Sequence, residues 1–555
     1  MPTIEASYQD LCELIGKKVG IEELKELVNF AKCEIDAVDG DNLKIEAKDT
    51  NRPDLWSSEG IAREIKSRIF KPKFPEYKVK KSDVVVEVDR KVAKVRPYTV
   101  CAVVKNLNVS QAFLSQMIQL QEKIAGTLGR NRKEVAIGVY DYDKIKPPIR
   151  FTTVEPDGIK FIPLDFTEEM TPREILEKHP KGKEFGHLLA GKKEYPIFID
   201  ARNEVLSLPP IINSEYSGKV TEETKNVFIE CSGFNLKFLM PALNVMVTAM
   251  ADRGGEICSV KVVYPDKTIF TPDLAPKKTF VDVDYIKKIS GLKLSLGEIC
   301  KLLEKANYKI LKKGKRIELL YPAYRNDIMH QRDVVEDVVI SYGYNQIEPE
   351  PLKMKTEGKI SEAEIQNEKI ANIMVSLGFQ EILSYTLTNK ANLFQKMNLK
   401  EEKVAEIENI VSENWSVFRN WLLPSLMEFF SNNQHVEYPQ KIFEVGNVVL
   451  IDEKQETRTR DVRKLAVAIA DSKVGYDDIA AVLDAFMSLV GVKYKLERAE
   501  HASFIQGRVA RILVRGKKIG IIGEIRPEVL ENWKLEMPVA AFEIEIENLK
   551  VWDEK

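Results

Sequence analysis

Cysteine and histidine are scarce in this chain of 555 residues, with six of the first and five of the second. No two cysteines are spaced as CxxC, and no HExxH stretch occurs. These absences exclude the common zinc sites and dithiol motifs. They predict reduced, mostly buried thiols in a reducing compartment.

Long apolar runs are also absent. No stretch of about 18 apolar residues occurs, so no membrane span is predicted. Glu5 and Asp10 interrupt the N-terminal residues, which therefore lack the apolar core of a signal peptide. We expect a soluble, cytoplasmic protein.

The chain has no excess of charge of one sign. Lys plus Arg number 83 and Asp plus Glu 85, for a net charge of -2, which excludes a generally basic coat and leaves only local patches for RNA. Apolar residues make up 44% of the chain, as in a globular protein. The length predicts about three to five domains.

Among the features that are present, an acidic helix is predicted within residues 325–344. Asp333, Glu336 and Asp337 share one helical face, and Asp327 can join them only from the preceding loop. Such a cluster suits a magnesium ion. It equally suits a solvated acidic face matched to the helix dipole, and the spacing alone favours that second explanation.

Strands are predicted at 197–199, 205–208 and 227–233. In the last of these, Glu230 and Ser232 alternate with apolar residues and share one face. Partly exposed sheets carry such pairs routinely, so the pattern alone is a weak indication of a site.

Periodicity predicts further elements outside these strands. Helical stripes occur at 24–31, 110–128 and 296–306, a strand at 43–47, and a hairpin at 308–320. Residues 63–81 carry eight Lys or Arg residues against two acids, which favours a solvated linker over a contact with a nucleic-acid backbone.

Four stretches together resemble the beta subunit of phenylalanyl-tRNA synthetase, of the archaeal and eukaryotic type. They are Arg325–Asn326–Asp327–Ile328 with its acidic helix, Asn51–Arg52–Pro53–Asp54, the LSLPPIIN run with VFIECSG, and Phe418–Arg419 before LLPSL. We interpret the second of them as a structural corner between Arg52, Asp54 and a helix start near Ser58.

The resemblance implies a magnesium ion shared with an alpha subunit, and it favours metal over the solvated face. Its ligands would be Asp327, Asp333, Glu336 and Asp337.

The resemblance also implies an editing pocket that removes tyrosine from mischarged phenylalanine tRNA. Its residues would be Phe198, Ser207, Glu230 and Ser232. Glu230 would accept a hydrogen bond from the tyrosine phenol, while the two serines orient the ester or the attacking water. This stretch contains no histidine or cysteine base, so we expect hydrolysis to depend on the positioning of water.

The expected fold is a multidomain α+β protein with four domains. They are an N-terminal α/β domain (1–88), a mixed α/β editing domain (89–270), a small helical, winged-helix-like module with the acidic helix (271–348), and an antiparallel domain of class II synthetase type (349–555).

The resemblance makes the last domain non-catalytic, and no second arginine in a GxGxxR setting follows within it to grip ATP. ATP would be bound by the alpha subunit, in a heterotetramer of two alpha and two beta chains with tRNA(Phe). Two alternatives stay open: a free-standing aminoacyl-tRNA deacylase, and a non-enzymatic RNA-binding scaffold.

Overall fold

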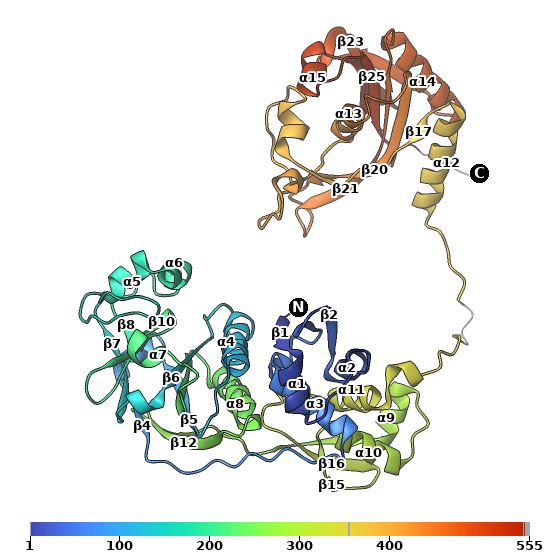
Figure 1. Cartoon of the computed structure of the whole chain (residues 1–555). Helices are drawn as coiled ribbons and strands as arrows, with labels where there is room; N and C mark the ends of the chain where they lie inside the picture. Colours follow the sequence, from blue (N-terminus) through green and yellow to red (C-terminus); the bar gives the residue numbers. More distant parts are fainter. Residues whose placement is uncertain (1, 353–355, 548, 550–555) are drawn as a thin grey trace. The chain divides into compact units, whose positions relative to one another are not determined.

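The computed structural model describes residues 2–352, 356–547 and 549, in two compact units, Met1–Pro351 and Leu352–Lys555 (Figure 1). The three domains predicted before residue 349 all fall within the first unit. The end of the predicted domain 349–555, residues 550–555, lies outside the described residues.

The first unit begins with a three-stranded sheet and three helices. They are β1 (Thr3–Ser7), α1 (Tyr8–Ile15), α2 (Ile21–Val28), β2 (Cys33–Asp39), β3 (Asn42–Ala47) and α3 (Ser58–Ile69), with sheet order β1-β3-β2. Leu24 and Val28 of α2 and Leu43 and Ile45 of β3 are buried. The predicted helix and strand are therefore confirmed.

The basic segment 63–81 is a solvated linker only in part: residues 71–81 form no helix or strand and are exposed or half-exposed, as predicted, whereas residues 63–69 are helical. Its first residues complete α3, where Arg63 is buried, pairs with Asp252 at 2.6 Å and stacks over the ring of Tyr324. A charge count fails here because aromatic and acidic partners from distant parts of the chain cover the guanidinium group.

The next strand, β4 (Val85–Val88), shifts the predicted domain boundary. It pairs in parallel with both β12 and β7, and its Val86 and Val88 are buried in the core of the following sheet. The N-terminal domain therefore ends upstream of residue 85, not at residue 88.

A ten-stranded sheet forms the middle of the first unit, with order β10-β9-β8-β7-β4-β12-β5-β11-β6 and with β13 beside β12. Its other strands are β5 (Tyr98–Lys105), β6 (Val135–Asp141), β7 (Ile149–Val154), β8 (Tyr195–Ile199), β9 (Val205–Leu208), β10 (Ile212–Asn213), β11 (Val227–Gly233), β12 (Glu256–Val263) and β13 (Thr268–Thr271). Its helices are α4 (Gln111–Gly126), α5 (Pro172–Lys178), α6 (Pro180–Phe185), α7 (Glu215–Gly218) and α8 (Leu236–Asp252).

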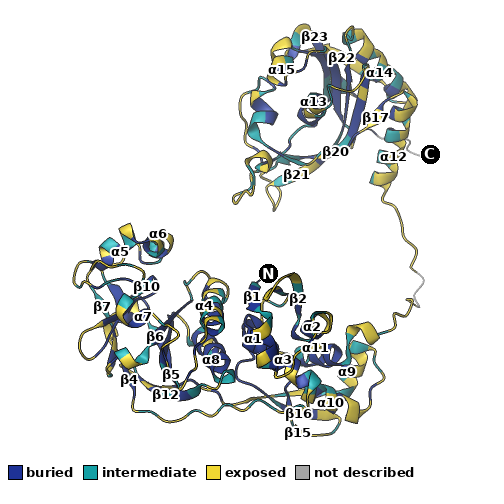
Figure 2. Cartoon of the chain, in the orientation of Figure 1, coloured by how far each residue is buried: buried dark blue, intermediate teal, exposed yellow. Residues whose placement is uncertain are grey.

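This sheet curls so that its two ends approach each other. The Asn213 amide of β10 donates to the Val139 carbonyl of β6 at 3.3 Å, and the Tyr140 hydroxyl of β6 donates to Ser207 of β9 at 2.7 Å. Helices α4 and α8 share a core with β5 and β11, and residues 241–250 of α8 are all buried (Figure 2). The meeting of the two sheet ends positions the candidate site.

A third group of elements combines three helices with a three-stranded antiparallel sheet. They are β14 (Lys277–Asp282), α9 (Val283–Ser290), α10 (Leu296–Lys305), β15 (Lys309–Lys312), β16 (Arg316–Tyr321) and α11 (Gln331–Tyr342), with sheet order β14-β16-β15. Ser295 caps α10 as predicted, and the predicted hairpin is formed by β15 and β16.

The second unit is a seven-stranded, mainly antiparallel sheet with helices on both faces. Its strands in pairing order are β17 (Gln380–Glu381), β20 (Gln440–Ile451), β21 (Thr459–Ala470), β25 (Val539–Glu545), β24 (Lys517–Ile525), β23 (Phe504–Val514) and β22 (Tyr494–Arg498), and β18 (Leu387–Thr388) pairs separately with β19 (Val417–Phe418). The helices are α12 (Glu362–Ser376), α13 (Leu423–Asn432), α14 (Tyr476–Leu489) and α15 (Pro527–Asn532).

Alternation along β21 explains the two covered faces. Leu465 and Val467 pack in the core formed with α12 and α14, whereas Ala466 and Ala468 pack in the core formed with α13 and α15. Across the described residues of both units, no helix combines the length and the apolar character needed to cross a membrane.

Candidate functional site

The predicted editing residues lie around a cleft where the two ends of the ten-stranded sheet meet. The cleft has a volume of about 440 Å³, and both Ser207 and Glu230 line it. Its apolar wall comes from α4, including Leu114, Met117 and Ile118, and the opposite wall from residues 209–213. A cleft of this size and mixed lining can hold a small organic group.

Two polar side chains of the cleft lining, Ser207 and Glu230, meet a third, Tyr140, that lies behind them, and each of the three comes from a different strand. The Tyr140 hydroxyl of β6 donates to Ser207 Oγ of β9 at 2.7 Å and reaches Glu230 Oε1 of β11 at 3.2 Å. Strand pairing explains the approach of β6 and β11, because Glu230 is paired directly with Gly138. The structure therefore brings Ser207 and Glu230 together, with Tyr140 between them.

Glu230 is an acid without full hydrogen bonding. The side chain is 2% exposed, and its Oε2 atom has no hydrogen-bond partner among the described residues. Burial raises the pKa of Glu230 to about 8, against the opposing effect of the nearby Arg96 charge. A buried acceptor with no partner is costly unless a ligand supplies a donor.

Ser232 and Phe198 do not line the cleft. Ser232 Oγ accepts a hydrogen bond from Arg96 Nε at 3.0 Å, and Arg96 also donates to the carbonyls of Arg132 and Lys133. Phe198 is fully buried and stacks on Phe151 with ring centres 4.3 Å apart. Both residues therefore lie behind the surface that a ligand would touch.

Sequence reasoning missed three residues of this region: Tyr140, Arg96 and His179. Tyr140 lies about 90 residues along the chain from its hydrogen-bond partner Glu230. Arg96 lies more than 130 residues from its partner Ser232. Only the strand pairing of β11 with β6 could have indicated Tyr140.

His179 also lines the cleft, although no histidine lies in the strands first considered. Its Nδ1 accepts from the Lys181 backbone at 3.1 Å, and its Nε2 lies 3.2 Å from the Leu164 carbonyl. With both ring nitrogens engaged, the imidazole is placed to shape the wall and not to take a proton from water.

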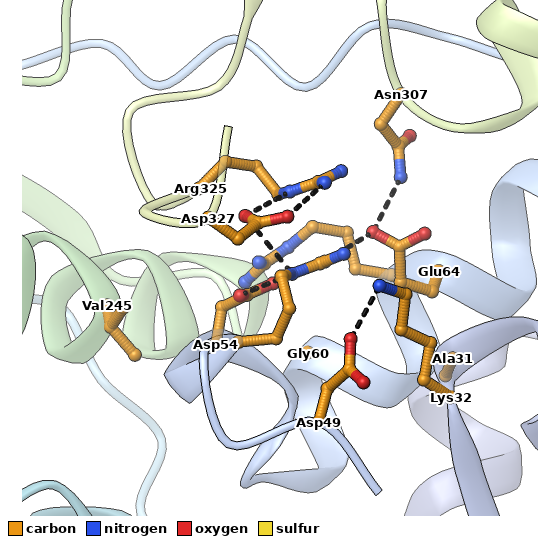
Figure 3. A network of polar contacts seen from close by, with 12 residues as sticks. Ala31, Lys32, Asp49, Asp54, Gly60, Glu64, Val245, Asn307, Arg325 and Asp327 are labelled. Atoms are coloured by element: carbon orange, nitrogen blue, oxygen red, sulfur yellow. Dashed lines mark hydrogen bonds and ion pairs between the residues drawn. The ribbon is translucent and has the colours of Figure 1, made fainter. Parts of the chain in front are cut away.

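The four predicted magnesium ligands have other partners in this chain. Arg325 binds Asp327 through two hydrogen bonds, of 2.8 and 2.5 Å, and Asp337 at 2.8 Å (Figure 3 shows Arg325 and Asp327). Asp333 accepts from the backbone of Met329 and His330 at the start of α11. Glu336 pairs with Lys32 at 2.9 Å.

These contacts do not fit a magnesium site built by this chain alone. A cation beside Asp327 and Asp337 would meet the positive charge of Arg325, and the Arg325 and Arg52 charges hold the pKa of Asp327 well below its usual range despite burial. Among the described residues, three acids within mutual ligand reach occur at Glu34, Asp36 and Glu46, which are mostly exposed. Magnesium at α11 stays a prediction that requires ligands from another chain.

Charged groups in the second unit are likewise engaged internally. Arg419 pairs with Glu444 at 2.8 Å, and both side chains are buried. Arg419 also donates to Ser384 Oγ at 2.7 Å in a partly buried contact. A side chain at Gly446 would come within 2.6 Å of the guanidinium, so glycine there makes room for Arg419. Arg419 is therefore a structural residue in this unit.

Three domain families match the chain in succession. The B3/4 domain matches residues 97–240, the tRNA synthetase B5 domain residues 279–344, and the phenylalanyl-tRNA synthetase beta chain CLM domain residues 347–546. The cleft lies within the first of these stretches and α11 within the second.

Relatives that match nearly the whole chain are phenylalanine–tRNA ligase beta subunits. The phenylalanine–tRNA ligase beta subunits of Pyrococcus abyssi and Pyrococcus horikoshii are each 54% identical over 549 residues, covering 98% of this chain and 99% of the relative. A crystal structure of an N-terminal fragment of the Pyrococcus horikoshii phenylalanyl-tRNA synthetase beta subunit is 55% identical, with a TM-score of 0.60, over 62% of this chain and all of the fragment. The chain therefore belongs to the phenylalanine–tRNA ligase beta-subunit family and is a subunit of that ligase.

Proposed function

We propose that this chain acts with an alpha subunit to attach L-phenylalanine to tRNA(Phe) using ATP, and that its own cleft hydrolyses mischarged Tyr-tRNA(Phe). Family membership supports the first part. The observation that carries the second is the buried Oε2 of Glu230, a residue of the cleft lining, which has no hydrogen-bond partner within the part of the chain that the structure describes.

The need for a second site follows from the chemistry of the two amino acids. Tyrosine is phenylalanine with one added hydroxyl, and an apolar pocket rejects an added hydroxyl only about a hundredfold. A hydrolytic site that requires the hydroxyl corrects the remaining errors. The free oxygen of Glu230 is an acceptor suited to that hydroxyl, and phenylalanine would leave it unpaired.

For hydrolysis, the tyrosyl ester would lie along the apolar wall of α4 with its phenol at Glu230. Ser207, 2.7 Å from the Tyr140 hydroxyl, would help to orient the ester or the attacking water. Water then cleaves the bond between the tyrosyl group and the ribose. The chain contributes positioning and exclusion of bulk water, without a covalent intermediate.

We assign charging with phenylalanine to the alpha subunit because buried charged side chains of the second unit are paired with groups of the same unit. Arg419 is paired with Glu444, and Glu543 accepts from the Leu422 and Leu423 backbone at 2.8 and 3.0 Å. An ATP site of class II type needs arginines free to meet the triphosphate. ATP is thus proposed to bind the alpha subunit, in an assembly of two alpha and two beta chains.

Magnesium enters the proposal only for the assembled ligase. Asp333 and Glu336 are the partly exposed acids of α11, so ligands from the alpha subunit can approach them. Asp327 and Asp337 keep their guanidinium partner in this arrangement.

The test of the hydrolytic site uses the complex formed by co-expression with an alpha chain. We expect Glu230→Ala to lower deacylation of Tyr-tRNA(Phe) by about a hundredfold or more, as for loss of a hydrogen bond that a site is built around. Charging with phenylalanine should be unchanged. Glu222→Ala, which removes an exposed acid of the same domain, is the matched control.

Unaltered deacylation by Glu230→Ala would exclude this cleft as the hydrolytic site. The same assays separate the alternatives. A free-standing deacylase would work equally well without the alpha chain, and a scaffold would hydrolyse nothing in either state.

A further inference from the structure

We propose that Tyr140 is a positioning residue of the cleft, whose phenol hydroxyl engages Ser207 and one oxygen of Glu230 so that the other oxygen is reserved for the phenol of a tyrosyl ester. This inference rests on the proposed hydrolysis of Tyr-tRNA(Phe) and extends it to a residue outside the four predicted ones.

The first step concerns how Tyr140 reaches the floor. Its ring lies back along its own strand over Gly138, where an added Cβ would stand 2.1 Å from the Tyr140 hydroxyl. On its other side the ring packs against Phe228, with centres 5.9 Å apart. Glycine at 138 and phenylalanine at 228 together fix the hydroxyl between Ser207 and Glu230.

The second step concerns the two oxygens of Glu230. The Tyr140 hydroxyl contacts Oε1 at 3.2 Å, whereas Oε2 is buried and has no partner among the described residues. Glu230 is one of the residues that line the cleft, and the proposal is that a ligand held there reaches this oxygen. Tyr140 thus holds the carboxyl group in an orientation in which Oε2 is available to accept a hydrogen bond from a ligand.

The third step concerns selectivity. A tyrosyl group brings one phenol donor to Oε2, which completes the hydrogen bonding of Glu230. A phenylalanyl group in the same place seals the oxygen from water without replacing the bond, which is unfavourable. Losing the hydroxyl of Tyr140 frees the carboxyl group to turn, so discrimination between the two esters should fall.

The experiment uses the α–β complex and compares Tyr140→Phe with wild type. We expect kcat/KM for deacylation of Tyr-tRNA(Phe) to fall roughly tenfold, the size of one hydrogen bond to a buried acid. Charging with phenylalanine should be unchanged. Tyr142→Phe removes the phenol of a nearby tyrosine, whereas the hydrogen bonds to Ser207 and Glu230 come from Tyr140, and this control should behave as wild type.

A pH profile separates positioning from a general loss of structure. The groups facing Glu230 are Tyr140 of β6, Cys101 of β5, Ser207 of β9, Ser232 of its own strand and the guanidinium of Arg96. Because the Tyr140 hydroxyl lowers the pKa of Glu230, its loss should move the pH of half-maximal deacylation upward relative to Tyr142→Phe.

Gly138→Ala provides an independent variant, since the new methyl group must displace the Tyr140 ring. It should lower deacylation of Tyr-tRNA(Phe) in the same way. If wild type is active and Glu230→Ala is inactive while Tyr140→Phe matches wild type, this inference fails and the proposed function stands. Faster deacylation by Tyr140→Phe would show that the ring blocks the cleft, and it would also overturn the inference. An inactive wild-type complex would overturn the proposed function itself.

Discussion

Glu230 is a carboxyl group in the middle of a strand whose seven residues are all buried. Such a group keeps its proton more strongly in the folded protein than in the unfolded chain, because burial disfavours the charged form. Its pKa rises from 4.5 to about 8. Glu230 should therefore weaken the fold as the pH rises.

We predict that Glu230→Gln reduces the pH dependence of stability. Between about pH 4.5 and pH 8 the folded protein holds a proton that the unfolded chain releases, so the free energy of unfolding falls by about 1.4 kcal/mol per pH unit as the pH rises. Glutamine does not titrate and escapes this loss. Denaturant unfolding of the first unit should be measured at about pH 5 and about pH 8. The free energy of unfolding of the variant, relative to wild type, should be higher by a few kcal/mol at about pH 8 than at about pH 5.

Glu222→Gln, at an exposed position of the same domain, is the control and should follow wild type at both pH values. Parallel curves for wild type and Glu230→Gln would mean that Glu230 is ionised in the folded protein at neutral pH.

At this scale the sequence predicted half of the pocket. Ser207 and Glu230 lie together at its floor, but Phe198 and Ser232 are packed behind it. Alternation along a strand tells which residues share a face, yet a shared face can be buried by another part of the sheet. The position of Tyr140 depends on the curling of the sheet, which no local pattern encodes.

At the scale of elements, the loop before α3 and the loop before α11 are joined by buried ion pairs. Arg52 binds Asp54 at 2.8 and 2.7 Å and Glu64 at 3.0 Å, and it lies 3.8 Å from Asp327 of the second loop (Figure 3). Gly60 allows the contact, because a Cβ there would overlap the Asp54 carbonyl. The predicted structural corner is thus confirmed, and it also anchors the acidic helix.

We predict that Arg325→Met destabilises the first unit by about 3–5 kcal/mol, because it leaves the buried carboxylates of Asp327 and Asp337 without their main cation. Scanning calorimetry of the purified complex measures the effect. Arg332→Met, at an exposed position of α11, should change stability by less than about 0.5 kcal/mol.

Magnesium gives this prediction a second test. If the guanidinium neutralises these acids, adding magnesium or a chelator should leave the transition of the isolated chain unchanged. A large shift with magnesium would instead show that a cation competes with Arg325.

The helices that periodicity predicted were found, since long stripes such as that of α4 fit one element only. The boundary at residue 88 was wrong. A strand of four residues such as β4 pairs equally well with an earlier or a later sheet in sequence terms, and only its partners β7 and β12 decide the matter. The acidic helix was also predicted correctly, but the pattern did not show its ion-pair partners, which are Lys32 from a distant part of the chain and Arg325 from the loop directly before the helix.

At the scale of the whole molecule, the two units differ in how their buried charged groups are paired. The first unit holds the cleft with an unsatisfied acid, and the second has its buried arginine and acids paired with one another. The two activities of the ligase should therefore be separable by substitution in one unit or the other.

The surface of the second unit indicates where this separation can be made. Leu383 and Tyr385 are 85% and 76% exposed, and Tyr385 contacts the half-exposed Trp415 with ring centres 5.6 Å apart. Exposed aromatic and aliphatic side chains in one group are typical of a surface that a partner covers. We assign this group, Leu383, Tyr385 and Trp415, to contact with the alpha subunit.

The double variant Leu383→Glu, Trp415→Glu should weaken assembly with the alpha chain at least tenfold, because it places charges in a desolvated contact. Phenylalanine charging should fall with assembly, whereas deacylation of Tyr-tRNA(Phe) by the beta chain should persist in proportion to the tRNA that it still binds. Leu489→Glu, at an exposed leucine that ends α14 in the same unit, is the control and should assemble as wild type. Size-exclusion chromatography with both activity assays measures the outcome. Full assembly by the double variant would move the contact elsewhere, and joint loss of both activities despite a folded chain would show that the cleft depends on the alpha subunit.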